Sequence, residues 1–276
     1  MRNFDQHNIT EAVLSSFANA SDPRLQKVLC SLVQHLHAFA EEVQLTEAEW
    51  SQGIQFLTRC GQISDDKRQE FILLSDVLGL STLMVAMNQS QPAGCTEATV
   101  LGPFHTHDAP ACASGDDIAR GAKGTPCVVR GTVKSLKGEP ISGAAIDVWH
   151  SDEEGLYDVQ RKGLSHAQGR GRLQSDAQGS FHFRSVLAQP YPIPHDGPVG
   201  QMLEATGRHP WRPAHVHFLI QAPGYASLTT HLFRSQGEYL DSDAVFGVRQ
   251  SLICDWVQQA DGSFELVYDF VLNPMP

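Results

Sequence analysis

The sequence lacks any apolar run of about 18 residues, the length that a membrane-spanning helix requires. Its first ten residues, MRNFDQHNIT, contain no apolar segment of the kind found in a secretory signal. Together these absences predict a cytoplasmic protein that is not inserted in a membrane. The sequence also shows no internal repeat and no low-complexity tract, so a repeat architecture is not expected.

Paired cysteines and positive charge are also scarce. The six cysteines are scattered without a CxxC pair, which predicts thiols rather than a disulfide framework. There are 20 Lys and Arg against 31 Asp and Glu, for a net charge of −11. This balance argues against nucleic acid or an anionic membrane as the main partner, although one local arginine can hold a small anionic substrate. The 13 histidines, by contrast, make metal chemistry worth examining.

The hydrophobic periodicity changes near residue 105. Before that point it is helical, and we expect helices over residues 10–20, 23–44 and 67–88. Pro23 suits the first turn of the second helix, and the capping box that begins at Thr46 predicts the start of another helix.

From residue 127 the period is two. CVVRGTVKS, AAIDVWHS, GSFHFRSVL, HVHFLIQAP and FELVYDFVL read as strands separated by Gly, Pro, Asp and Asn turns. Strands joined by short turns predict an antiparallel sandwich. We therefore expect an α+β protein, with a helical part and linker over residues 1–105 and an antiparallel β-sandwich over residues 106–276.

Three H-x-H pairs differ in what their geometry permits. His35 and His37 lie in a predicted helix, roughly 200° apart around its axis, so they cannot easily share a metal. A second pair, at positions 105 and 107, lies in a loop, where histidines bind a metal or nothing at all. His215 and His217 lie in a strand, where residues i and i+2 share a face. They are either packed core residues or half of a metal site.

Two tyrosines stand in unusual settings. Tyr157 follows a glycine that ends an acidic turn, and Tyr191 is bracketed by prolines. Each alone is explained as a packed aromatic. With the strand histidines they indicate a sphere of two tyrosines and two histidines. Phenolate is a hard anionic donor, and two of them favour Fe(III) over Zn(II) or Cu(I).

Four stretches carry a family resemblance: EATVLGPFH (97–105), PISGAAIDVWHSDEEGLYDVQ (140–160), GRGRLQSDAQGSFHFRSVLAQPYPIPHDGPVG (169–200) and HPWRPAHVHFLIQAPGYASLTTHLF (209–233). In this order they resemble the intradiol ring-cleaving dioxygenases of the catechol 1,2-dioxygenase type. The resemblance implies a non-haem Fe(III) bound by Tyr157, Tyr191, His215 and His217. It also implies a homodimer joined partly by N-terminal helices, in which many members hold a phospholipid.

The resemblance also implies catalytic roles and a substrate. Arg212 matches the active-site arginine of the family, and Tyr191 would leave the metal to accept a proton. Where catechol enzymes usually have Gln, this chain has His231 in LTTHLF. With YLDSDAVFGV (239–248) and EFILLSDVLGLS (70–81), that change looks like the hydroxyquinol branch, which converts 1,2,4-trihydroxybenzene and O2 to maleylacetate in the degradation of aromatic compounds.

Substrate-binding residues follow from the resemblance and from polarity. Leu73 and Asp76 share a face of a buried apolar helix, where the carboxylate needs a partner. That partner is either the third hydroxyl of the substrate or a helix–loop contact. The remaining pocket residues that we expect are Val100, Leu101, Gly102, Pro103, Ile193, Pro194 and Val245.

Three alternatives stay open at this point. The enzyme could be a catechol or chlorocatechol 1,2-dioxygenase instead. Residues 127–187 also resemble transthyretin-like sandwich modules, which bind carbohydrate or protein and have no need of the two tyrosines or of the H-x-H pair. Arg212, finally, could form a structural salt bridge with the acidic run 152–154 rather than serve catalysis.

Overall fold

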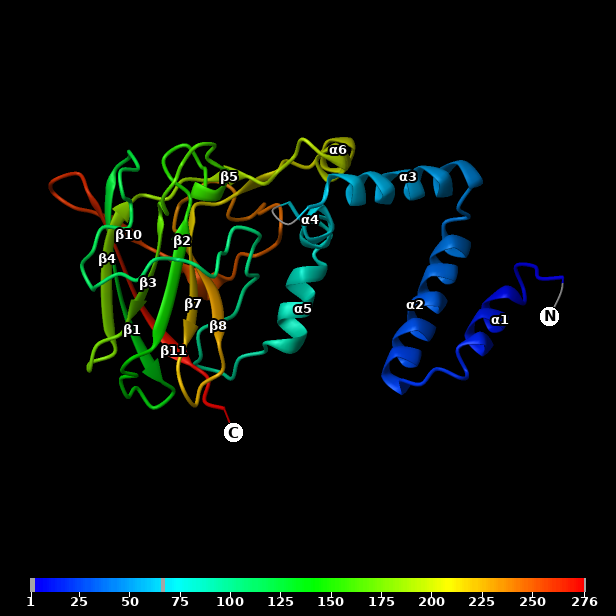
Figure 1. Ribbon diagram of the computed structural model, residues 1–276, viewed down its shortest axis with the longest axis horizontal. Coiled ribbons are helices and arrows are strands. Elements are labelled where there is room, and N and C mark those ends of the chain that lie inside the picture. Colours follow the sequence, from blue (N-terminus) through cyan, green and yellow to red (C-terminus); the bar gives the residue numbers. More distant parts are fainter. Residues whose placement is uncertain (1–2, 66–67, 276) are drawn as a thin grey trace. The chain divides into compact units, whose positions relative to one another are not determined.

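The computed structural model describes residues 3–65 and 68–275. By internal contacts the chain forms two compact units, which divide between Arg59 and Cys60. The first unit carries α1 (Ile9–Ser16), α2 (Pro23–Glu42) and most of α3 (Glu47–Ile63). The second unit carries the sheets and the helices from α4 onward (Figure 1).

The helix starts follow the capping signals of the sequence. The Asp22 side chain accepts hydrogen bonds from the backbone N–H groups of Arg24 and Leu25, and Pro23 occupies the first turn of α2. Before α3, Thr46 and Glu49 form the predicted capping box: the Glu49 carboxylate accepts from the Thr46 N–H, and Thr46 Oγ1 accepts from the Glu49 N–H. Both predicted helix starts are confirmed.

The single helix predicted over residues 67–88 is wrong; residue 67 itself lies outside the described residues. The structure has two helices, α4 (Glu70–Val77) and α5 (Leu80–Asn88), bent by 77° at the break. Gly79 between them has φ of +75°, a left-handed conformation that ends a helix and that side chains other than glycine rarely adopt. Burial also differs from the prediction, since α5 has no buried residue.

Among the described residues no single helix is long and apolar enough to cross a membrane. The bent pair of α4 and α5 meets that length and composition only when taken together. The cytoplasmic location expected from the sequence stays a prediction.

Two sheets face each other in the second unit (Figure 1). One has the order β10-β11-β1-β4 and the other β3-β2-β7-β8-β9. A short ribbon pairs β5 with β6. The strand bounds are β1 Pro126–Ser135, β2 Ala145–His150, β3 Arg170–Gln174, β4 Ser180–Val186, β5 Tyr191–Pro192, β6 Trp211–Arg212, β7 His215–Gln221, β8 Leu228–Arg234, β9 Ile253–Cys254, β10 Trp256–Gln258 and β11 Phe264–Leu272.

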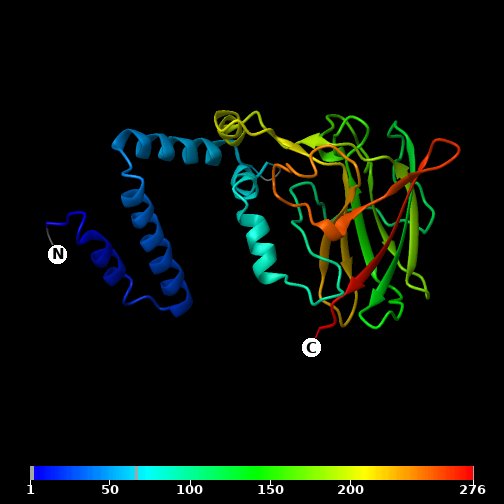
Figure 2. The same ribbon diagram turned by 180° about the vertical axis from the view of Figure 1, so that it is seen from behind.

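The predicted α+β class and the sandwich are confirmed, but the sheets are mixed rather than purely antiparallel. β1 pairs parallel with β11, and β8 pairs parallel with β9. The strand β11, red in Figure 2, lies between β10 and β1, so the chain returns late to the middle of a sheet that it began at residue 126. Such a late return places two strands of the same direction side by side.

The core between the sheets contains aromatic contacts from both layers. Phe218 of β7 packs against Phe270 of β11, with ring centroids 4.8 Å apart, and its ring is also near Phe181 of β4. Val216 and Phe218 are therefore on the core face of β7. His215 and His217 alternate with them, so the two histidines point to the opposite face of that sheet.

The remaining elements of the second unit are α6 (Pro198–Ala205) and two 3-10 turns, η1 (Asp158–Gln160) and η2 (Gln250–Leu252). Glu70 joins α4 to the start of α6. Its buried carboxylate accepts from the Val199 N–H at 3.1 Å and pairs with Arg68.

Candidate metal and substrate site

Two histidine nitrogens meet on the outer face of β7. The Nε2 atoms of His215 and His217 are 3.1 Å apart, and both side chains are 1% exposed. On the neighbouring strand β8, His231 lies opposite His217, and their ring centroids are 4.1 Å apart. Among the described residues, these three histidines form the one group of His, Cys, Asp or Glu side chains that could hold a metal ion.

Both predicted tyrosines lie against this group. Tyr157 comes immediately before η1, and its hydroxyl oxygen is 3.0 Å from His217 Nε2. Phe104 stacks on the Tyr157 ring at 4.5 Å. Tyr191, on β5, has its ring 5.2 Å from that of Tyr157 and 5.6 Å from that of His215. The structure thus brings together all four side chains predicted as ligands.

The protonation of His215 follows from its hydrogen bonds. Its Nδ1 lies 2.7 Å from the Pro213 carbonyl oxygen, which can only accept, so Nδ1 carries the proton. Burial and the nearby Arg212 lower the pKa of His215 to about 3, so the ring is neutral and its Nε2 keeps a lone pair. A backbone carbonyl that fixes the other nitrogen is the usual support of a metal-ligating histidine.

His217 and Tyr157 are held in their neutral forms in the same way. Burial lowers the pKa of His217 well below its ordinary value and raises the pKa of Tyr157 well above its own. A cation among these atoms would take up the lone pairs and favour the phenolate form. Neutral imidazole nitrogens and phenol oxygens converging within about hydrogen-bond distance fit a transition-metal ion with N and O ligands.

His231 is buried, and among the described residues its ring nitrogens meet no hydrogen-bond partner of good geometry, with only a weak contact to the backbone of Val100. A buried polar ring of this kind needs a partner. Its ring is 4.7 Å from that of His215, so a molecule bound at the site could supply that partner.

Arg212 lies beside the histidines and is 2% exposed. Its Nη1 is 3.3 Å from the Tyr191 hydroxyl and 3.3 Å from His215 Nε2. The acidic run 152–154 is not its partner, because Arg161 contacts both Asp152 and Glu154. Arg212 instead forms a buried ion pair with Asp243.

A cavity of about 480 Å³ lies against α4, α5 and the turn at residues 100–103. It is lined by Gln69, Ile72, Ser75, Asp76, Leu80, Ser81, Met84, Val85, Val100, Leu101, Gly102 and Pro103. Five of the predicted pocket residues are therefore brought together: Asp76, Val100, Leu101, Gly102 and Pro103. The described lining does not include Leu73, Ile193, Pro194 or Val245, although all but Pro194 are buried.

Gly102 connects the turn to the histidines. Its φ is +76°, and a Cβ atom at this position would lie 3.2 Å from Cε1 of His217. A side chain here would both strain the backbone and press on the ring. The turn therefore lies directly over one of the candidate ligands.

Asp76 has a partner within the helices. Burial raises the pKa of this carboxyl, while a side-chain hydrogen bond with Ser81 of α5 acts in the opposite direction. Ser81 is itself 2.9 Å from Ser75 across the helix break. The predicted helix–loop contact therefore takes the form of a helix–helix contact, at the wall of the cavity.

The other H-x-H pairs lie outside the cluster. His35 bonds the carbonyl of Ser31 in its own helix, and His37 bonds Thr10. His105 lies 3.7 Å from Asp147, and its ring packs on that of Trp149.

Sequence reasoning missed three side chains of the site. Trp149 stacks on His217 at 4.6 Å, Phe104 stacks on Tyr157, and Asp243 pairs with Arg212. Trp149 could have been predicted once β2 was paired with β7, since residues opposite each other in a sheet share a face and Trp149 lies opposite His217. Asp243 lies in a loop of irregular backbone, where no hydrophobic periodicity predicts which way a side chain points.

Comparisons with known proteins agree with this geometry. Residues 22–96 match the family model for the catechol dioxygenase N terminus, and residues 100–274 match the dioxygenase model. The 6-chlorohydroxyquinol 1,2-dioxygenase of Cupriavidus pinatubonensis is 62% identical over 99% of both chains. The hydroxyquinol 1,2-dioxygenase of Nocardioides simplex is 49% identical over 94% of this chain and 88% of that one.

Comparison with solved structures also finds a hydroxyquinol 1,2-dioxygenase. The hydroxyquinol 1,2-dioxygenase of Pseudomonas putida DLL-E4 aligns with a TM-score of 0.92 and 44% identity, covering 98% of this chain and 99% of that one. The transthyretin-like binding-module alternative is therefore wrong. The sequence models, the relatives and the shared architecture together show that this chain belongs to the intradiol ring-cleaving dioxygenase family.

Proposed function

We propose that this protein cleaves hydroxyquinol (1,2,4-trihydroxybenzene) between its two adjacent hydroxylated carbons with O2, giving maleylacetate. The observation that carries the proposal is a buried cluster of three ligand atoms. His217 Nε2 lies 3.1 Å from His215 Nε2 and 3.0 Å from the Tyr157 hydroxyl oxygen. The names of relatives at 62% and 49% identity support the substrate.

Fe(III) is the metal we propose, held by Tyr157, Tyr191, His215 and His217. Two phenolates and two neutral imidazoles form a hard donor set that offsets the charge of a trivalent ion. When bound, the ion would draw electron density from the diol oxygens of the substrate and so prepare the ring to react with O2. Membership of the intradiol dioxygenase family also supports non-haem iron as the metal.

Tyr191 and Arg212 have complementary roles in this proposal. The Tyr191 oxygen takes a proton from the substrate diol, which is general-base work. Burial alone would lower the pKa of Arg212, but the Asp243 carboxylate and Tyr191 raise it above its ordinary value. The guanidinium therefore stays charged and stabilises negative charge on the ring, an interaction worth on the order of 3 kcal/mol in a dry site.

His231 and the cavity supply substrate recognition. The hydrogen-bonding nitrogens of His231 have no well-formed partner within the described residues, so a substrate oxygen can fill that role. Asp76 lines the cavity from α4. In this proposal it binds the third hydroxyl, which catechol lacks. Leu73, Ile193, Pro194 and Val245 remain proposed residues of the pocket rim.

Chlorinated hydroxyquinols are a second candidate substrate class. The relative at 62% identity is named for 6-chlorohydroxyquinol, and the cavity wall includes Leu80, Met84 and Val100. Such apolar side chains can pack against a chlorine atom. Catechol and chlorocatechol remain the alternative substrates if Asp76 does not discriminate.

We further propose a homodimer formed through the N-terminal helices, with a phospholipid bound there. One face of α2 and its C-cap residue present apolar side chains that are 45–54% exposed: Leu25, Val28, Leu32, Leu36, Phe39 and, at the C-cap, Val43. They follow a spacing of three and four residues, which forms one stripe along the helix. Exposed contiguous apolar surface of this kind indicates an interaction site. Residues 1–105 are the proposed dimerisation and linker region, and residues 106–276 the catalytic domain.

The test is the visible spectrum of the iron-loaded protein without O2. Two tyrosinates on Fe(III) should give a broad band that moves to longer wavelength when hydroxyquinol is added. After admission of O2, chromatography should show maleylacetate formed in proportion to O2 consumed. A colourless protein that takes up no iron would contradict the metal site, and an equal shift with catechol would favour the alternative substrates.

Matched variants sharpen the result. His217→Ala should abolish the band and the activity, because it removes a ligand from the centre of the cluster. His35→Ala serves as control, since that exposed histidine lies far from the cluster in sequence and hydrogen-bonds the Ser31 carbonyl of its own helix. Equal loss in both variants would point to unfolding rather than to a metal ligand.

A further inference from the structure

Resting on the proposed function, we infer that Asp243 is the positioning residue that aims Arg212 at the reaction centre. The ion pair between them is buried on both sides, with Arg212 2% and Asp243 5% exposed. Arg212 Nε donates to Oδ1 at 3.0 Å, and Nη2 donates to Oδ2 at 3.3 Å. The carboxylate therefore grips one edge of the planar guanidinium.

The ion pair with Asp243 leaves one terminal nitrogen of Arg212 free to face the metal and substrate site. Nη1, the nitrogen not bonded to Asp243, is the one that lies 3.3 Å from both the Tyr191 oxygen and His215 Nε2. The planar group is rigid, so fixing its Nε and Nη2 edge fixes the direction of Nη1. Asp243 touches neither of those two site residues through a described hydrogen bond, so it acts through the arginine.

Backbone amides hold Asp243 in its turn. Its Oδ2 accepts from the Gly247 N–H at 2.9 Å, and its Oδ1 accepts from the Val245 N–H at 3.3 Å. The turn over residues 243–247 thus closes on the same carboxylate that grips the arginine. Movement of this turn would move the guanidinium.

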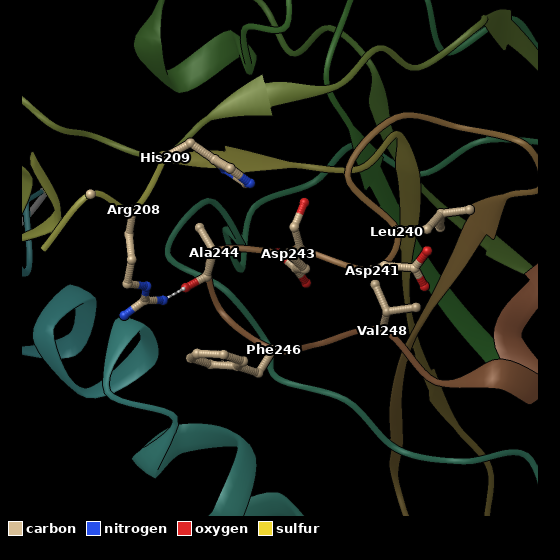
Figure 3. A pocket seen from close by; sticks show the side chains of 10 residues that line it. Arg208, His209, Leu240, Asp241, Asp243, Ala244, Phe246 and Val248 are labelled. Atoms are coloured by element: carbon tan, nitrogen blue, oxygen red, sulfur yellow. Dashed lines mark hydrogen bonds between the residues drawn. The ribbon is translucent and has the colours of Figure 1, made fainter.

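Arg208 ties that turn to the helices. It donates to the carbonyl oxygen of Val77 at the end of α4 and to that of Ala244, at 2.7 and 3.0 Å, and its guanidinium lies 5.0 Å from the Phe246 ring. Figure 3 shows the bond to Ala244 and the ring below it. Thr82 of α5 also bonds the Val245 carbonyl. The position of Arg212 is therefore coupled to α4 and α5, which line the substrate cavity.

A second cavity, of about 500 Å³, is lined in part by Asp243 (Figure 3). Asp241 and Asp243 both line it, but Asp241 is exposed and makes no ion pair among the described residues. The two carboxylates share a loop and a cavity and differ in their contact with Arg212. Asp241→Asn is thus a matched control for Asp243→Asn.

The experiment compares Asp243→Asn, Arg212→Gln and the double variant, each loaded with iron. We expect Asp243→Asn to lower kcat per bound iron about 10–100-fold, the usual effect of losing an outer partner of a site, with KM changed less than about threefold. The visible band should shift in the same direction as in Arg212→Gln. In the Arg212→Gln background, Asp243→Asn should change neither kcat nor the band.

Gly247→Ala tests the same inference with both charges retained. A Cβ atom at residue 247 would lie 3.0 Å from Nη2 of Arg212 and 3.1 Å from Oδ2 of Asp243, so it displaces the pair slightly. We expect a loss of kcat and a band shift in the direction given by Asp243→Asn. If Asp243→Asn does not fold, this variant and its combination with Arg212→Gln decide the result.

Three results would overturn the inference. One is that Asp243→Asn and Gly247→Ala have the same kcat per iron and the same band position as the wild type. Another is an equal fold-loss in the presence and absence of Arg212, which marks a merely structural ion pair. The third is the same effect from Asp241→Asn. Failure of the wild-type protein to bind iron or cleave hydroxyquinol would instead contradict the proposed function, so the two failures are distinguishable.

Discussion

At the scale of a single residue, Asp76 is the side chain that we propose distinguishes hydroxyquinol from catechol. Its carboxyl is 5% exposed, bonds Ser81 and lines the cavity of about 480 Å³. A buried carboxylate with one serine partner retains acceptor capacity for a ligand hydroxyl. A third hydroxyl on the aromatic ring is such a ligand, and a substrate with only two has nothing to offer at that point.

We predict that Asp76→Asn raises the KM for hydroxyquinol about tenfold and leaves the KM for catechol within about twofold. The expected size corresponds to a hydrogen bond to a charged group, about 1.5–3 kcal/mol at full strength. Steady-state kinetics on both substrates measures it, and catechol serves as the internal control. Parallel changes for both substrates would assign Asp76 to the helix contact alone.

At this scale the sequence predicts the neighbouring histidines of the site well and the partner of the buried arginine poorly. Strand alternation places His215 and His217 side by side, because period two is a local property of the backbone. The alternative that paired Arg212 with the acidic run 152–154 is wrong, because Arg212 pairs with Asp243 while Arg161 binds Asp152 and Glu154. Which carboxylate reaches a buried arginine depends on loop paths, and these are not encoded in a local pattern.

At the scale of elements, the break between α4 and α5 was missed because apolar periodicity continues through it. LLSDVLGLSTLM keeps its hydrophobic spacing across Gly79, and only the backbone conformation of that glycine ends the helix. The residue is a stop signal that the sequence contains, but glycine inside a helical pattern is often tolerated. Parallel pairing of β1 with β11 was missed for a different reason: strand direction depends on chain paths more than 100 residues long.

We predict opposite effects from two glycine substitutions. Gly79→Ala should destabilise the protein by about 1–2 kcal/mol, because φ of +75° is strained for alanine. Gly53→Ala, inside α3 and with no atom within 4 Å of the new Cβ, should stabilise it by roughly 0.5–1 kcal/mol through helix propensity. Urea denaturation of both proteins measures the difference, and effects of the same sign would contradict the left-handed break.

A cross-strand ion pair predicts how sheet stability depends on pH. Asp147 of β2 faces Arg172 of β3, with Oδ2 accepting from Nη2 at 2.9 Å. Burial alone would raise the pKa of Asp147, but the hydrogen-bonded Arg172 guanidinium and the neighbouring His105 ring, 3.7 Å away, lower that pKa to about 2. A lowered folded pKa stabilises the fold above the unfolded value near 3.9, and the stabilisation is lost as pH falls toward 2.

We therefore expect Asp147→Asn to cost about 2 kcal/mol of unfolding free energy at pH 7 and clearly less at pH 3. Denaturant titrations at the two pH values measure this. Asp269→Asn is the control, because Asp269 pairs with Lys134 at an exposed position, where ion pairs contribute little. A pH-independent cost at Asp147 would show that packing, rather than charge, is responsible.

At the scale of the whole molecule, the apolar stripe of α2 stays about half-exposed among the described residues of the first unit. Leu32 and Leu36, in the middle of the stripe, are 51% and 54% exposed. Burial of such side chains contributes about 25 cal/mol per Å², enough to stabilise association or to hold acyl chains. The proposed dimer and the proposed lipid would each remove this surface from water.

We predict that Leu32→Glu combined with Leu36→Glu lowers the apparent mass from dimer to monomer in sedimentation at micromolar concentration. Gln34→Glu, which adds charge on the opposite side of the helix, should leave the mass unchanged. Mass spectrometry of organic extracts should detect phospholipid with the wild type and less with the double variant. A monomeric wild type without lipid would contradict both partner proposals.

The position of β11 has a consequence for synthesis on the ribosome. The four residues proposed to bind iron have all been made once residue 217 is added, but the sheet behind them is closed by Phe264–Leu272, which pairs with both β1 and β10. Contacts between β1 and β11 span about 137 residues of chain, and such long-range pairing forms slowly. A nascent chain stalled before residue 264 would therefore expose its imidazoles and phenols without a closed sandwich, open to the wrong metal and to proteases. The last strand to be made is the one that ends this vulnerable interval.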